Sequence, residues 1–249
     1  MQGMIAVMVR FRSGSKVCGG SLSGERIVSG GEIYNLQDVE LLSPTSPSKI
    51  VCIGLNYREH ANELNMKLPD EPIIFLKPPS AVLDPGKDII YPKSSSQVDY
   101  EGELGVVIGK RCKNARALDY AEYILGYTCF NDVTARDLQK KDGQWTRAKS
   151  FDTFAPFGPG IAKIDPLNAN IQTRINGSVK QKSNTSDLIF DVPRLIEFIS
   201  RIMTLLPGDV IATGTPPGVG PLQKGDVVEV EIEGIGVLRN TIIGTDIKG

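Results

Sequence analysis

The sequence predicts a mostly β fold with short helices (an α+β class), in which a small N-terminal β domain precedes the main body. Short runs of β-branched and aromatic residues recur along the 249 residues, separated by turns rich in the 26 glycines and 16 prolines. Only one longer segment has a convincing helical period, so strands dominate. A polar, proline-containing segment, Ser43 to Pro47, resembles a linker. We therefore expect domains at residues 1–45 and 46–249.

The N-terminal residues favour short strands joined by glycine turns, at Ile5–Phe11, Lys16–Gly20 and Arg26–Val28. The apolar run Ile5–Val9 is too short for a signal peptide or a membrane span, and no longer run follows. The four cysteines are widely spaced and form no C-x-x-C pair, which favours reduced thiols in a cytoplasmic protein. They are Cys18, Cys52, Cys112 and Cys129.

In the main body, a short helix over Tyr57–Leu64 is expected to begin at an Asn56 cap, with Glu59 completing a capping box. A longer helix over Val192–Leu206 is expected after the cap residue Asp191. Asn176-Gly177 predicts a tight hairpin, because this pair tolerates the positive φ angles of a type I′ turn. The expected strands cover residues 50–55, 73–76, 98–109, 124–130, 171–175, 179–181, 210–213, 227–232 and 237–242.

Charge and histidine content narrow the functional classes. The 28 basic residues nearly balance the 29 acidic ones, which argues against a nucleic-acid binder. The single histidine, His60, excludes zinc sites built from several histidines and the two-histidine iron triad. A metal would then be held mainly by oxygen ligands, which points to Mg²⁺, Mn²⁺ or Ca²⁺.

Acidic residues gather in the predicted strand 98–109. Asp99, Glu101 and Glu103 alternate along it, so in an unbroken strand they share one face at spacings of about 6.6 Å. Like charges this close repel one another unless a cation or a proton neutralises them, and a divalent ion bound by the carboxylates is the simplest such cation. Gly102 and Gly105 favour close approach of a ligand or of another backbone. The alternative is an exposed strand face with solvated acids.

Further candidates follow the next strand. Asp132 is either a third oxygen ligand or the N-cap of a helix that begins at Val133 or Thr134. On that helix, Arg136 and Gln139 share a face and could present a cation and an amide to a substrate carboxylate.

His60 and Glu63 lie three residues apart on the predicted short helix, where a carboxylate can orient an imidazole for proton transfer. The alternative is a surface pair without function. Lys77 and Lys149 are candidate partners of a substrate carboxylate, although lone lysines usually face solvent. Gly214 and Thr215 belong to a loop over residues 213–220 that lacks a P-loop or dinucleotide pattern but could bind a small acid.

Taken together, these motifs resemble the fumarylacetoacetate hydrolase family, in family order over about residues 49–243. The residues that carry the resemblance are Gly54 to Glu63, Phe75 to Pro78, Asp99 to Leu104, Phe130 to Asp137, Ala148 to Asp152 and Thr213 to Pro216. The resemblance implies a β-roll of mixed sheets, usually assembled as a homodimer. Ile53 stands near the place of a fourth acidic ligand in the larger members, so the chain is more similar to the smaller acylpyruvase, decarboxylase and isomerase branch.

The same resemblance implies roles for the candidates. Glu101, Glu103 and Asp132 would hold Mg²⁺ or Mn²⁺, with Ca²⁺ as a possible substitute. His60 with Glu63 would activate water, and Glu63–Asp70 is a candidate lid. The residues that would position the substrate are Lys149, Arg136, Gln139 and Thr215, with Gly214 and Lys77 as further candidates.

The implied reaction begins with a 2-oxo acid and passes through an enolate that the metal stabilises. We expect hydrolytic C–C cleavage of acylpyruvates; decarboxylation of oxaloacetate-like acids and isomerisation of 2-hydroxydiene dioates share the same site. Two other classes stay open: a metal-free hydrolase such as a glycosidase that uses Glu101 and Glu103 as acid and base, and a non-catalytic protein that binds small acids. A small-molecule substrate is expected, with neither nucleic acid nor a membrane as partner.

Overall fold

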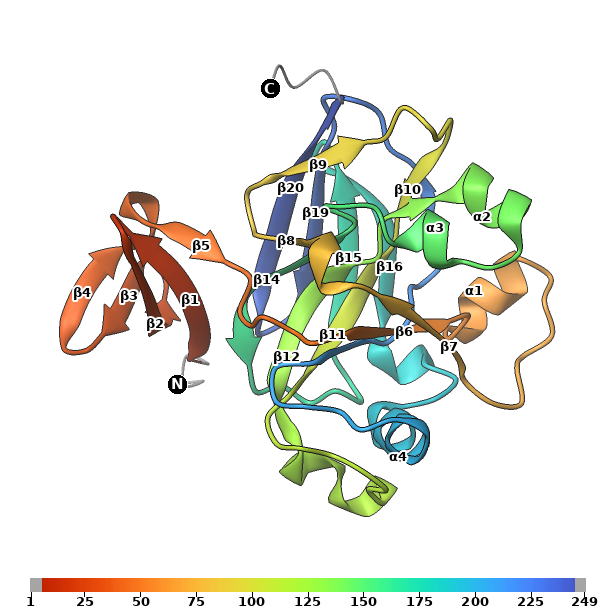
Figure 1. Cartoon of the computed structure of the whole chain (residues 1–249), viewed down its shortest axis with the longest axis horizontal. Coiled ribbons are helices and arrows are strands. Elements are labelled where there is room, and N and C mark those ends of the chain that lie inside the picture. Colours follow the sequence, from red (N-terminus) through yellow and green to blue (C-terminus); the bar gives the residue numbers. More distant parts are fainter. Residues whose placement is uncertain (1–5, 245–249) are drawn as a thin grey trace.

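The computed structural model describes residues 6–244 and has the expected mostly β architecture (Figure 1). The largest sheet follows the order β4-β3-β2-β1-β14-β12-β11-β17-β6-β7, with β5 paired to β1 and β8 to β14. Five strands form a second sheet, β16-β15-β19-β20-β9, and β13-β10-β18 form a third.

The strands of the first half are β1 Val7–Ser13, β2 Lys16–Ser23, β3 Arg26–Ser29, β4 Glu32–Asn35, β5 Glu40–Leu42, β6 Ile50–Gly54, β7 Ile73–Lys77, β8 Val82–Leu83, β9 Asp88–Tyr91, β10 Val98–Tyr100 and β11 Gly102–Ile108. Those of the second half are β12 Ile124–Asn131, β13 Thr134–Ala135, β14 Ala155–Ala162, β15 Asn170–Ile175, β16 Ser178–Asn184, β17 Val210–Ala212, β18 Gly220–Pro221, β19 Val227–Ile232 and β20 Gly236–Gly244. The helices are α1 Arg58–Glu63, α2 Arg136–Asp142, α3 Thr146–Lys149 and α4 Val192–Ile202, and short 3₁₀ turns cover Leu36–Asp38, Pro79–Ala81, Ala117–Glu122 and Thr185–Asp187.

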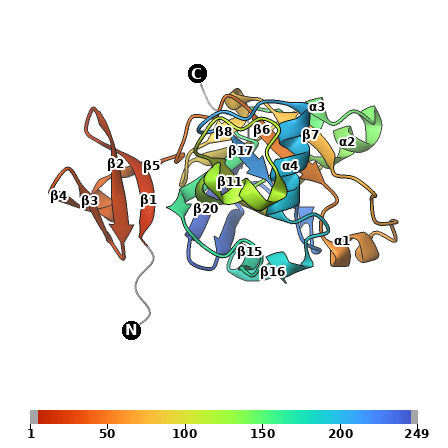
Figure 2. The ribbon, with the colours of Figure 1, turned by 90° about the horizontal axis from the view of Figure 1, so that it is seen from below.

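Strands β1–β4 lie to one side of the molecule in both views (Figure 1, Figure 2). Val9, Phe11 and Ile27 form a small core of their own there. The predicted first strand begins at Ile5, which lies outside the described residues; the observed strand starts at Val7. The domain boundary at residue 45 stays a prediction.

Strand β11 is buried on both faces, and this decides where functional side chains can lie. Leu104 and Val106 point into the largest hydrophobic core, which also holds residues of β15, β19 and α4. Glu103, which lies between Gly102 and Leu104 in the chain, points to the opposite face. The expected alternation along this strand is therefore confirmed from Gly102 onward.

The predicted strand over residues 98–109 is nevertheless two strands. β10 pairs with β13 and β18, whereas β11 pairs with β12 and β17. Glu101 sits at the change of partners, so its backbone belongs to neither strand.

Both helix predictions need correction at their ends. Asn56 does not cap α1, because its buried side chain instead donates to the carbonyls of Phe190 (3.0 Å) and Thr213 (2.7 Å). Asp191 does cap α4 and accepts from the amide of Arg194 at 3.0 Å. That helix ends earlier than predicted because Leu205 exchanges backbone hydrogen bonds with Cys112.

Other expectations are confirmed. Asn176 and Gly177 have φ angles of 50° and 79° in the turn between β15 and β16. All four cysteines are free thiols. Within residues 6–244, no helix has the length and apolar character that crossing a membrane requires.

Asp209 joins the start of the main body to β17. Its fully buried carboxylate accepts hydrogen bonds from the amides of Ser48 (2.9 Å), Lys49 (3.2 Å) and Leu206 (2.8 Å), and pairs with the Lys49 ammonium. Burial raises the pKa of Asp209, but the bonds from Lys49, Leu206 and Ser48 outweigh burial and hold the pKa below its ordinary value.

We predict that Asp209→Asn lowers the free energy of unfolding by about 2–3 kcal/mol at pH 7, because the buried amides and the Lys49 ammonium that bind this side chain lose its negative charge. The pKa of Asp209 is lower in the folded state than in the unfolded state, so its ionised carboxylate stabilises the protein above the ordinary carboxyl pKa of about 3.9. This stabilisation is lost as the pH falls through the folded-state pKa. Urea unfolding at pH 7 and at pH 3 should therefore show a smaller difference between the variant and the parent at the lower pH. Asp119→Asn, at an exposed ion pair, is the control and should change little. An equal loss at both pH values would contradict the prediction.

Candidate active site

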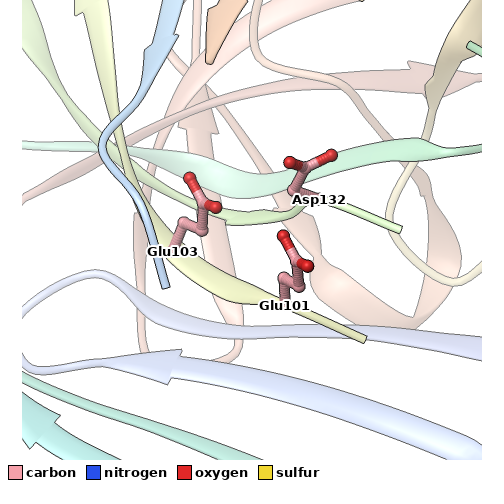
Figure 3. Close-up of side chains that lie close together, drawn as sticks. All are labelled: Glu101, Glu103 and Asp132. Carbon is pink, nitrogen blue, oxygen red and sulfur yellow. The ribbon is translucent and has the colours of Figure 1, made fainter. Parts of the chain in front are cut away.

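Three carboxylates converge where β10, β11 and β12 meet (Figure 3). Glu101 and Glu103 flank Gly102, and Asp132 directly follows β12. The pairing of Gly102 with Asn131 brings the two chain segments together, and the amide of Asp132 donates to the Glu101 carbonyl at 2.8 Å. One carboxylate oxygen from each residue lies within 4.8 Å of the others, and all three residues are buried.

Because the strand is interrupted at Glu101, Asp99 does not belong to this group of three carboxylates. The Asp99 carboxylate accepts hydrogen bonds from Arg136 Nε at 2.8 Å and from the side-chain Nε2 of Gln97 at 3.0 Å. The solvated-face alternative is wrong for this strand, since Asp99, Glu101 and Glu103 are 3%, 7% and 1% exposed.

Asp132 is not a helix cap. Helix α2 begins at Arg136 after Ala135, and no side chain caps it. The Asp132 carboxylate instead pairs with Lys77 and with Lys149 Nζ, the latter at 2.6 Å. It is thus available as the third member of an oxygen cluster.

Three cations surround the carboxylates. Lys149 Nζ also contacts Glu101 Oε2 at 2.8 Å and lies 5.0 Å from the centre of the Phe75 ring. Arg136 bridges Asp99 and Glu101, and donates to Gln139 Oε1 at 2.6 Å, so the predicted shared face of Arg136 and Gln139 is confirmed. Both lysines are buried, which rules out the solvent-facing alternative for them.

The carboxylates differ in their electrostatic surroundings. Burial raises the pKa of Glu101, but the Lys149 and Arg136 cations outweigh burial and lower the pKa to about 2. Burial raises the pKa of Glu103 well above its ordinary value, and the charges of Asp132 and Glu101 raise it further. Glu103 accepts from the amide of Gly214 at 2.8 Å but has no cationic partner among residues 6–244.

This donor set suits a hard divalent cation. Mg²⁺ and Mn²⁺ favour carboxylate oxygens, and ligand oxygens about 2.1–2.4 Å from one ion lie at most about 4.2–4.8 Å apart. The oxygens of the cluster lie within 4.8 Å of one another, the upper end of that range. An ion here would share Glu101 and Asp132 with Lys149, and would give Glu103 its missing positive partner.

Helix α1 carries the histidine pair. His60 Nδ1 lies 2.8 Å from Glu63 Oε2, which leaves the other ring nitrogen, Nε2, for a substrate or water. Glu63 Oε1 also accepts from the amide of Gly218 at 3.2 Å, which ties the helix to the loop 213–220. The His60 and Glu63 side chains are 13% and 44% exposed, so solvent reaches the pair.

A cavity of about 320 Å³ is lined by members of both groups, Glu101 and Glu103 of the triad and His60 of the histidine pair. Four of the predicted residues do not line it: Asp132, Glu63, Lys77, which bonds to Asp132, and Gly214, which bonds to Glu103. The polar lining residues are His60, Glu101, Glu103, Arg136, Gln139, Lys140, Lys149 and Thr215; the apolar ones are Ile53, Leu55, Leu64, Met66, Phe75 and Trp145.

Sequence reasoning missed Trp145, and of the two expectations for the glycines it is close approach of protein, not of a ligand, that the structure shows. Trp145 forms one wall, packs on Phe75, and lies so close to Gly54 that a Cβ there would be 2.8 Å from its ring. A Cβ at Gly102 would lie 2.1 Å from Thr173 Oγ1, and one at Gly105 would lie 2.8 Å from Thr128 Cγ2. The glycines beside the acids therefore allow close packing of protein, which no local sequence signal reveals.

Comparison with known proteins agrees with this geometry. The family model described as "Fumarylacetoacetate (FAA) hydrolase C-terminal" matches residues 49–243. Oxaloacetate tautomerase Fahd2a of Rattus norvegicus is 44% identical over 218 residues, which cover 82% of this chain and 70% of that protein.

Two solved structures resemble the whole chain. One is a 5-carboxymethyl-2-hydroxymuconate delta-isomerase from Mycobacterium smegmatis, at 46% identity and a TM-score of 0.90, covering 98% of this chain and 99% of that one. The other is a 2-hydroxyhepta-2,4-diene-1,7-dioate isomerase from Mycobacterium marinum, at 44% identity and a TM-score of 0.89, covering 97% and 99%. On this evidence, the chain belongs to the fumarylacetoacetate hydrolase family.

Proposed function

We propose that this protein is a Mg²⁺- or Mn²⁺-dependent enzyme that moves protons in small 2-oxo acids, interconverting their keto and enol forms or relocating a double bond. The observation that carries this proposal is one cavity lined both by Glu101 and Glu103 of the carboxylate triad and by His60, whose ring Glu63 holds. The names of the tautomerase and isomerase relatives support the same chemistry.

Glu101, Glu103 and Asp132 would hold the divalent ion, with Ca²⁺ as a possible substitute. When bound, the ion supplies Lewis-acid stabilisation of the negative charge that develops on the 2-oxo oxygen.

Arg136 and Lys149 would bind and orient the acid. Arg136 has five N–H donors, of which Asp99, Gln139 and Glu101 each receive one, so two remain for a substrate carboxylate. Lys149 has three donors and gives two to the triad, which leaves one for a developing negative charge. The surrounding bonds hold both cations in place before substrate arrives.

His60 would carry the proton. The Glu63 carboxylate fixes the ring through Nδ1, so Nε2 is the atom that accepts a proton from the carbon beside the 2-oxo group and returns it elsewhere. The apolar wall of Leu64, Met66 and Trp145 would limit water in the cavity.

Hydrolytic C–C cleavage of acylpyruvates is the second candidate. It is favoured by the solvent exposure of Glu63, which lets water reach the histidine pair. Decarboxylation of oxaloacetate-like acids would use the same residues. The expected homodimer, the cytoplasmic location and the lid over Glu63–Asp70 belong to this proposal as well.

The deciding experiment follows enol-oxaloacetate by ultraviolet absorbance with Mg²⁺, and separately measures release of CO₂ and formation of pyruvate from an acylpyruvate. We expect enol decay above the rate with Mg²⁺ alone, abolished by EDTA, without matching CO₂ release. Pyruvate formation from the acylpyruvate as the faster reaction would establish the hydrolase instead. Rates equal to Mg²⁺ alone in all three assays, by protein that binds Mn²⁺, would refute the enzyme proposal.

We predict that Glu103→Gln weakens Mn²⁺ binding about 100-fold or more, because the triad loses the carboxylate that has no other cationic partner. Titration of free Mn²⁺ by electron paramagnetic resonance measures the affinity. Glu71→Gln, an exposed acid, serves as the control and should bind as the parent does. Unchanged affinity in Glu103→Gln would place the metal elsewhere.

We predict that His60→Gln and Glu63→Gln lower kcat about 10²- to 10⁴-fold, the usual contribution of a general base, while Mn²⁺ affinity stays near that of the parent. The loss should be smaller for Glu63→Gln, since an amide still accepts a hydrogen bond from the ring. Steady-state kinetics alongside Mn²⁺ titration separate the two effects. A normal kcat in His60→Gln would remove histidine from the mechanism.

A further inference from the structure

Gln181 holds the stretch of chain that carries the two glutamates of the triad. It lies on β16, outside the cavity, and is 1% exposed. Its Oε1 accepts from the amide of Gly102 at 3.0 Å, and its Nε2 donates to Thr215 Oγ1 and to the Pro216 carbonyl, both at 2.8 Å. One buried side chain therefore joins the link between Glu101 and Glu103 to the loop 213–220.

Two further side chains complete this arrangement. Thr215 Oγ1 donates to the Gly102 carbonyl at 3.0 Å, so both polar groups of the Gly102 backbone are bound by side chains. Asn131 Oδ1 accepts from the amide of Glu101 at 3.0 Å. Gln181, Thr215 and Asn131 thus supplement the backbone bond from the Asp132 amide to the Glu101 carbonyl at the point where β10 ends and β11 begins.

The position of Glu101 relative to Glu103 depends on this point. The chain leaves one sheet and enters another there, so regular pairing does not fix its path. Gly102 fits because Thr173 Oγ1 and Gln181 Oε1 would lie 2.1 and 3.3 Å from a Cβ at that position. The chain at Gly102 is therefore held on the side where a Cβ would lie, by packing against Thr173 and by the amide side chain of Gln181.

We propose that Gln181 is a positioning residue for the divalent-metal site. Through Gly102 and Thr215 it sets the placement of Glu101 and Glu103 relative to the loop 213–220. This inference rests on the metal site proposed above. It also limits the role of Thr215, because the one hydroxyl hydrogen of this residue is donated to Gly102 and is not free for a ligand.

The test is Gln181→Met, which keeps the length of the side chain and removes its polar atoms. We expect at least a tenfold loss of Mn²⁺ affinity and a changed electron paramagnetic resonance line shape of the bound ion. A loss of stability alone would leave that line shape unchanged in the folded protein, so the spectrum separates positioning from general destabilisation.

Thr173→Val is the matched control. Thr173 pairs directly with Gln181 across the sheet, is fully buried, and its hydroxyl has no hydrogen-bond partner among residues 6–244. Its replacement should leave Mn²⁺ affinity within twofold of the parent. Equal losses in the two variants, or none in Gln181→Met, would overturn the inference.

Thr215→Val gives an independent route if Gln181→Met does not fold. We expect weakened Mn²⁺ binding and, in the double variant, a combined loss smaller than the product of the two single losses, since both act on Gly102. Full Mn²⁺ affinity in Thr215→Val, or multiplicative losses in the double variant, would count against the inference. Failure of the parent protein to bind Mn²⁺ would refute the proposed metal site itself, and Gln181 would lose this role with it.

Discussion

The burial of six charged groups in one region, with a seventh, Arg136, half-buried beside them, is the constraint on which the site depends. Three carboxylates (Asp99, Glu101, Asp132) pair with three cations (Lys77, Arg136, Lys149), Glu103 accepts from the amide of Gly214, and each charge would be costly to bury alone. Removal of one partner leaves another unpaired, so the arrangement is specified as a whole. Arg136 and Lys149 use only part of their hydrogen-bonding capacity on the carboxylates, and both line the cavity.

The two-sided burial of β11 makes this arrangement possible. One face of the strand contributes to the largest core, while the other presents Glu103 beside a second, smaller core. Residues of α4 and the second sheet cover the first face, and on the other face the loop 213–220 binds Glu103 through the amide of Gly214. The small residues at 102 and 105 let neighbouring strands approach closely enough to exclude water.

The proton-transfer group is attached differently. His60 and Glu63 lie on a six-residue helix that side chains from distant segments hold in place: Asn56 bonds to Phe190 and Thr213, and Asp187 accepts from the amide of Glu59. The triad is thus built into the sheets, whereas the histidine pair sits on a more exposed element above it. This division is consistent with a family whose members perform several reactions on related acids.

The sequence by itself determined the mostly β class, the hairpin at Asn176-Gly177, the cap at Asp191 and the residues of the candidate site, because each depends on local chemistry or on a motif within a few residues. Only the tertiary structure decided the strand break at Glu101, the use of Asn56 away from its own helix, and the burial of Lys77 and Lys149. The tertiary structure also decided the hydrogen bond between the Gly102 amide and the Gln181 side chain, which lie 79 residues apart in the chain. These features arise from contacts between distant segments, where the need to pair buried charges and backbone groups outweighs local preference.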